Sequence, residues 1–100
     1  MPRPPHTPEA KFTRALRETC RKSAKLGYYP SDFDGMLDKV GGVSVARKLV
    51  ASGEIQSGLK RLKKLKRLDL SMEHLMLDER FRGLFKDPEL EAAEWRLKHV

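Results

Sequence analysis

The chain has 100 residues, of which 39% are hydrophobic and 35% are charged, and its 21 lysines and arginines against 14 aspartates and glutamates give a formal net charge of +7. This length is typical of a single domain. No segment approaches the ~20 apolar residues of a transmembrane helix, and the first ten residues, MPRPPHTPEA, lack the apolar stretch of a secretory signal. A single cysteine, Cys20, excludes an internal disulfide and favours a reducing compartment. We therefore expect a cytoplasmic protein that spans no membrane, with a charge that favours polyanionic partners.

The N-terminal third predicts a flexible arm followed by an amphipathic helix. Residues 1–7 hold three of the six prolines, and we expect them to form a loosely ordered arm. Thr7 stands before Pro8 and Glu9, which is typical of a helix start. The helix is expected over residues 8–26, with Gly27 as its stop. At helical spacing its less polar face consists of Phe12, Ala15, Leu16, Thr19, Ser23 and Leu26, opposite a cationic face.

Three further helices are predicted before residue 70. Ser31 and Asp34 resemble a weak capping box for a helix that runs to Val40 and stops at Gly41-Gly42. A short helix over residues 43–51 follows, with its inward face made of Val43, Ala46, Leu49 and Val50. Ser57 is expected to cap a basic helix over residues 58–68, whose leucines stand at positions 59, 62, 65 and 68.

The C-terminal third predicts two short helical segments and a longer last helix. Ser71 and Asp78 are each placed to cap a short helical segment, and Asp87-Pro88-Glu89 marks the start of the last helix. The inner stripe of that helix is expected to be Leu90, Ala93 and Leu97. The sequence shows no sustained alternation of period two. We therefore predict an all-α, compact single-domain bundle over residues 8–100, with six or seven helices, several of them short.

The order of several motifs resembles a small, widespread bacterial helical domain. The motifs are LGYYPSDF (26–33), GGVSVARKL (41–49), GLKRLKKLKRLDLSMEHLMLDERFRGLF (58–85) and ELEAAEWRL (89–97). Members of that family stand alone or are attached to other proteins, nuclease-like ones among them. The resemblance implies a compact module of bacterial origin and carries over no catalytic residue. Where members tend to have an aromatic, an acidic and a small residue, this chain has Lys63, Lys64 and Lys66, so it is more cationic than its relatives.

No pattern of residues predicts catalysis or metal binding. Asp32, Asp34 and Asp38 form a DxDxxxD run, but its spacing lacks the alternate oxygen ligands of a calcium loop and fits an acidic first helical turn. The three histidines and Cys20 lack the close pairs of a zinc site. A nucleophilic pair of Cys20 and a histidine needs a cleft that a chain this short is not expected to enclose, so Cys20 is expected at the edge of the core. We expect no cofactor, no small-molecule substrate and no enzymatic activity.

Two cationic helix faces are the strongest functional signal. Residues 11–25 contain six cations and one acid, and residues 60–67 contain six cations and no acid. Such faces are suited to the phosphate backbone of DNA or RNA with little base specificity, although a solvated surface also explains either face alone. The candidate nucleic-acid-binding residues are Arg14, Arg17, Arg21 and Lys25 on the first face and Lys60, Lys63, Lys64 and Arg67 on the second.

Two other modes of binding remain open. The helix–Gly41-Gly42–helix arrangement resembles a helix-turn-helix that would place Val45, Arg47 and Lys48 near a DNA groove, although an ordinary helical hairpin explains it equally well. The second mode is a protein-interaction adaptor for an acidic partner or a larger nuclease-type protein. By its angle from Leu90 on the last helix, Trp95 is expected to be partly exposed and is the candidate partner-binding residue.

Overall fold

The computed structural model describes residues 7–52 and 57–100. Within these ranges all regular structure is helical, which confirms the all-α prediction. The predicted arm falls almost wholly on residues 1–6, which lie outside the described residues. The α-helices are α1 (Pro8–Lys25), α2 (Ser31–Val40), α3 (Gly42–Ala51), α4 (Ser57–Lys64), α5 (Met72–Met76) and α6 (Asp87–His99), with single 3₁₀ turns η1 (Leu68–Leu70) and η2 (Arg82–Leu84).

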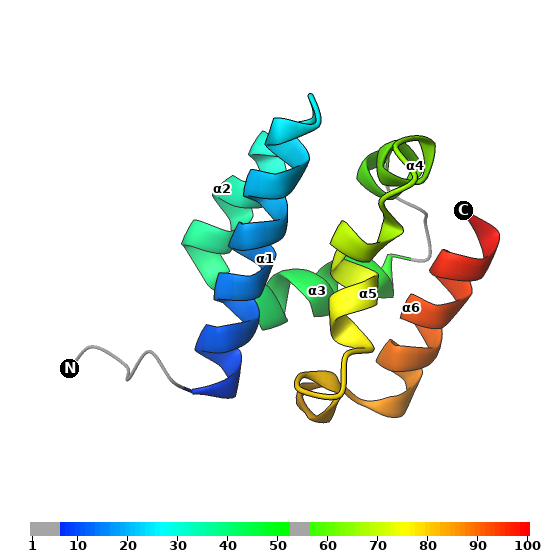
Figure 1. Cartoon of the computed structure of the whole chain (residues 1–100). Helices are drawn as coiled ribbons and strands as arrows, with labels where there is room; N and C mark the ends of the chain where they lie inside the picture. Colours follow the sequence, from blue (N-terminus) through cyan, green and yellow to red (C-terminus); the bar gives the residue numbers. More distant parts are fainter. Residues whose placement is uncertain (1–6, 53–56) are drawn as a thin grey trace.

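Helix α3 is the centre of the bundle. It packs against α1 and α2 on one side and against α5 and α6 on the other, as Figure 1 shows. Helix α4 lies at the end of the molecule near the C-terminus (Figure 1) and contacts η1. The Cα radius of gyration is 12.8 Å, close to the ~13 Å expected for a compact domain of this length.

The core joins the first helix to the last third of the chain. Phe12 and Leu16 of α1 are fully buried. The ring of Phe12 makes edge contacts with Phe81 and Phe85, at centroid distances of 5.3 and 5.2 Å. Such edge-to-face pairs contribute about 0.5–1.5 kcal/mol each beyond the area they bury. The inward face of α1 predicted from helical spacing is therefore correct at these residues, whereas Leu26 is 40% exposed because α1 ends before it.

Two glycines set the close packing between α1, α2 and α3. Gly41 has a φ of 82°, which ends α2 in a conformation that L residues rarely adopt. The N–H of Gly42 donates to Thr13 Oγ1 at 2.9 Å. A Cβ atom at Gly42 would lie 2.9 Å from Leu16 Cδ1 and 3.1 Å from Phe12 Cδ2. The absence of a side chain at Gly42 therefore lets the start of α3 touch α1.

Helix starts follow the predicted capping residues in part. Thr7 Oγ1 accepts from the N–H of Ala10 at 3.2 Å, and Ser71 Oγ accepts from the N–H of His74 at 3.1 Å, so these two caps are confirmed. The capping box at Ser31 is wrong, because Ser31 is already the first residue of α2 and no side chain caps that end.

Two further details of helix boundaries differ from the predictions, for local reasons. The last helix begins at Asp87, at the predicted start, but Lys86 and not Asp87 is in the cap position, where the Lys86 N–H donates to the Glu89 carboxylate at 2.7 Å. Helix α4 ends at Lys64 instead of continuing to residue 68. Lys66 has a φ of 58°, a left-handed conformation, and the Arg67 N–H returns to the Leu62 carbonyl at 2.9 Å, which closes the helix as a tight turn.

Candidate nucleic-acid interface

The predicted cationic face of α1 is partly neutralised by acids. Arg14, Arg21 and Lys25 are exposed. Arg17 is half-buried: its Nη2 donates to Asp38 Oδ1 at 2.5 Å, and its Nη1 lies 3.5 Å from Asp34 Oδ1. The Arg21 guanidinium lies 2.6 Å from Glu18 on the same helix.

These ion pairs change the role of the α1 face. Asp34 and Asp38 belong to α2, so Arg17 links the two helices, and the DxDxxxD run serves as its counter-charge. Tyr29 Oη fixes Asp34 from the other side, donating to its Oδ2 at 2.9 Å. Two of the four predicted phosphate contacts on α1 are therefore already engaged by carboxylates.

The second cationic face keeps most of its charge unpaired. Helix α4 turns Leu59 and Leu62 into the protein, where both are buried, and this orientation directs its basic side chains outward. We define the α4 surface as the exposed cations Lys60, Arg61, Lys63, Lys64 and Lys66. Within the described part of the chain, the structure gives Lys60 and Lys64 no ion pair, and the ammonium group of Lys63 donates to the carbonyl of Val100.

Arg67 borders the α4 surface without adding to its charge. Its Nε and Nη2 donate to the two carboxylate oxygens of Asp69 at 3.0 and 3.1 Å. This hydrogen-bonded pair lowers the pKa of Asp69. The positive φ of Lys66 turns the backbone at the end of α4, so that Lys66 itself remains exposed beside the helix. The concentration of unpaired cations is therefore on α4 and its C-terminal turn.

The structure contradicts the placement of Val45 beside a DNA groove. Val45 is 1% exposed and belongs to the core, because α3 is covered by four neighbouring helices. Arg47 Nη2 donates to the Leu84 carbonyl at 2.9 Å, and its Nε lies 3.4 Å from the Glu89 carboxylate. The predicted groove-facing trio therefore includes a core residue and an arginine that holds η2 and α6 in place.

Trp95 has the exposure that its helical angle predicts. It is 49% exposed on α6. Its ring stacks on that of His99 one turn later, with centroids 4.4 Å apart and planes 19° apart. The outer side of α6 also carries the exposed acids Glu91 and Glu94.

Cys20, which was expected at the edge of the core, is a buried core residue. It is 7% exposed and lies in the main hydrophobic cluster. Burial raises its pKa to about 11, so the thiol is protonated at neutral pH. Residues 7–52 and 57–100 contain no group of three or more His, Cys, Asp or Glu side chains arranged to hold a metal ion.

Two buried charged residues were missed by the sequence analysis. Glu73 on α5 is 4% exposed, and Arg96 on α6 is 2% exposed. Arg96 Nη2 donates to the Leu49 carbonyl at 2.8 Å, at the C-terminal end of α3. Arg96 lies three residues after Ala93, so helical spacing places it on the same inner face of α6 as Ala93. The prediction instead assigned this inner position to the apolar Leu97, which is only partly buried.

Comparisons with protein-family models, curated proteins and solved structures find no match to this chain. In the described part of the chain, no helix has both the length and the apolar character needed to cross a membrane.

Proposed function

We propose that the protein binds the phosphate backbone of nucleic acid, chiefly through the α4 surface. The observation that carries this proposal is the run of six cations without an acid over residues 60–67, five of them exposed on one helix and its turn. Exposed lysines without carboxylate partners gain most from phosphate, because no existing ion pair has to be broken. The α1 face is a secondary contact, since Arg17 and Arg21 already pair with acids.

The nature of this surface implies little base specificity. Lysine ammonium groups act as point charges and bind phosphate without the planar two-point geometry that reads base edges. Four of the five cations of the α4 surface are lysines. We therefore expect DNA and RNA to bind with similar, strongly salt-dependent affinity.

The test is fluorescence anisotropy with labelled duplex DNA and single-stranded RNA at 50 and 200 mM salt. Phosphate contacts from the five cations of the α4 surface predict a loss of affinity of about five hundredfold over this range. The variant Lys60→Gln/Lys64→Gln removes two unpaired lysines and is expected to reduce the slope of log affinity against log salt by about two.

The matched control is Lys39→Gln/Lys86→Gln, which removes the same two charges from exposed positions on α2 and before α6. It is expected to leave the slope nearly unchanged, because non-contacting charges act only through the weak overall field. Equal effects of the two variants would show that total charge, and not the α4 surface, governs binding. Affinity weaker than about 10⁻⁴ M for both nucleic acids would contradict the proposal.

A second candidate function is a protein-interaction adaptor for an acidic partner or a larger nuclease-type protein. The half-exposed Trp95, stacked on His99, favours it, because exposed tryptophans are frequent anchors of protein interfaces. Under this alternative, Trp95→Ala abolishes capture of a partner from nuclease-treated bacterial lysate, and Lys60→Gln/Lys64→Gln has little effect. Under the nucleic-acid proposal, Lys60→Gln/Lys64→Gln weakens nucleic-acid binding and Trp95→Ala has little effect on it.

A further inference from the structure

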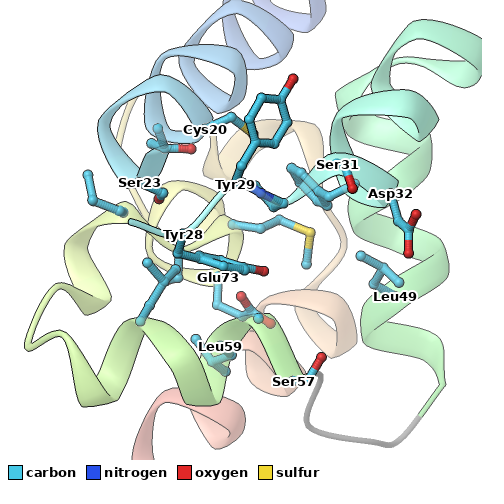
Figure 2. Close-up of a pocket in the computed structure, with 18 of the residues that line it drawn as sticks. Cys20, Ser23, Tyr28, Tyr29, Ser31, Asp32, Leu49, Ser57, Leu59 and Glu73 are labelled. Atoms are coloured by element: carbon cyan, nitrogen blue, oxygen red, sulfur yellow. The ribbon is translucent and has the colours of Figure 1, made fainter. Parts of the chain in front are cut away.

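A pocket of about 390 Å³ separates the two cationic helices. Its walls come from the C-terminal part of α1, the start of α2, α4, and the segment from η1 to α5, as Figure 2 shows. Most of the wall is apolar, with Phe33 and Met36 on one side and Leu59, Leu62 and Met72 on the other. A pocket of this volume is at the lower end of the range for small-molecule sites.

A buried carboxylate projects into this pocket. Glu73 is 4% exposed, and Figure 2 shows its side chain reaching in from α5 between Tyr28 and Leu59. No lysine or arginine of the described residues forms an ion pair with it. Burial raises the pKa of Glu73, opposed by its own backbone N–H and by the positive charge of Arg96. A carboxylate buried without a cationic partner is unfavourable for the folded protein, and a bound cation relieves that cost.

Two hydroxyl groups share the same pocket wall. Ser23 is 2% exposed and lines the pocket. The hydroxyl of Tyr28 lies against α4, where a Cβ atom at position 58 would come within 2.7 Å of it. Gly58 therefore gives the Tyr28 ring the room to lie across the pocket. Both hydroxyls are able to donate to or accept from a polar ligand.

We propose that this pocket binds a small organic amine, with its cationic group on Glu73 and its apolar ring or chain among Leu59, Leu62 and Met72. The proposal does not depend on nucleic-acid binding by the α4 surface. The carboxylate selects a positive charge, and the apolar wall selects a compact hydrophobic body attached to it. Asp32, the other carboxylate among the lining residues, is exposed, and the described residues hold no group of three or more His, Cys, Asp or Glu side chains that would suit a hard metal ion.

The test compares ligands of matched shape and different charge. Tryptamine, its neutral analogue tryptophol, and the anionic indole-3-acetate are titrated into the protein, and the methyl resonances of the leucines and methionines are followed by NMR. We expect saturable shifts at Leu59, Leu62 and Met72 with tryptamine, about ten to a hundred times weaker binding of tryptophol, and no detectable binding of indole-3-acetate.

The variant Glu73→Gln is expected to bind tryptamine and tryptophol equally. The matched control Glu91→Gln, which alters an exposed carboxylate of α6 outside the pocket, is expected to retain the preference for tryptamine. Equal affinity of the wild-type protein for tryptamine and tryptophol would overturn the proposal, as would tryptamine-induced shifts confined to other surfaces or no saturable binding. The wild-type comparison decides the question even if Glu73→Gln fails to fold.

Discussion

Burial determines the chemistry of Cys20. The thiol is 7% exposed and its pKa is raised to about 11, chiefly by burial, with the negative charge of Asp34 adding to the effect and Arg17 opposing it. At pH 8 the thiolate fraction is then about a hundredfold lower than for a thiol with a pKa of 9.0. We predict that alkylation by iodoacetamide at pH 8 is at least about a hundredfold slower in the folded protein than in guanidinium chloride. Comparable rates in the two states would show that Cys20 is accessible.

The raised pKa of Glu73 makes its contribution to stability depend on pH. In the folded protein this carboxyl group binds its proton more tightly than in the unfolded chain, where its pKa is about 4.5. The free energy of unfolding therefore decreases as pH rises from about 4.5 through the folded-state pKa, and then levels off. Glutamine does not ionise, so Glu73→Gln lacks this loss of stability. The Tm of Glu73→Gln should therefore rise relative to the wild-type Tm as pH increases from about 4.5 through the folded-state pKa of Glu73.

The control for this prediction is Glu91→Gln, because Glu91 is exposed. Its Tm difference from wild type should vary little over the same range of pH. Thermal unfolding followed by circular dichroism at several pH values measures both differences. A Glu73→Gln difference that is constant with pH would mean that Glu73 is solvated in the folded state.

Between elements, the contact of α1 with the start of α3 has no space for a side chain. A Cβ atom at Gly42 would lie 2.9 Å from Leu16 Cδ1 and 3.0 Å from Thr13 Oγ1. We predict that Gly42→Ala lowers the free energy of unfolding by about 1–3 kcal/mol through overpacking. Gly83→Ala is the control, because nothing lies within 4 Å of a Cβ atom there. Urea unfolding measures both, and equal effects would contradict this account of the α1–α3 contact.

The helix boundaries that were predicted correctly from the sequence are those that depend on residues close along the chain. The caps at Thr7 and Ser71 were correct, because each side chain bonds to a backbone N–H three residues later. The end of α4 was missed, because it depends on the left-handed conformation of Lys66, which no glycine or asparagine marks. The burial of Val45 was missed because α3 lies between helices that are distant in the sequence.

The candidate sites show the same contrast between features set by residues close along the chain and features set by residues far apart in it. The positions of the cations on α1 and α4 follow from helical periodicity and were predicted. The neutralisation of Arg17 was not, because Asp38 is 21 residues away. The pocket around Glu73 was also not predictable, since its walls come from segments spread over residues 19–73. Local spacing therefore located the charges but not their partners.

At the scale of the whole molecule, Arg96 of α6 connects the last helix to the central helix α3 through hydrogen bonds. Its guanidinium donates to the Leu49 carbonyl at 2.8 Å and to the Val50 carbonyl at 3.3 Å, and it lies 3.4 Å from Ser52 Oγ. These carbonyls belong to the last turn of α3, where a positive charge also interacts favourably with the helix dipole. Removal of the guanidinium leaves these buried groups without this donor.

We predict that Arg96→Met lowers the free energy of unfolding by about 2–3 kcal/mol, because methionine fills much of the volume but donates no hydrogen bond. Arg82→Met, at an exposed position in η2, is the matched control and should change it by less than about 0.5 kcal/mol. Urea unfolding of both variants measures the difference. A small effect of Arg96→Met would show that water readily replaces the guanidinium at the end of α3.

The contact of Phe12 with Phe81 and Phe85 bears on the order of events during synthesis. The two partners are made 69 and 73 residues after Phe12, which takes about 4–15 s at typical rates of translation. During that interval Phe12 lacks its two aromatic partners, even after α3 has been made. This part of the core is thus among the last to be completed, and the nascent chain passes through a stage at which a chaperone that recognises exposed aromatic residues is able to bind at Phe12.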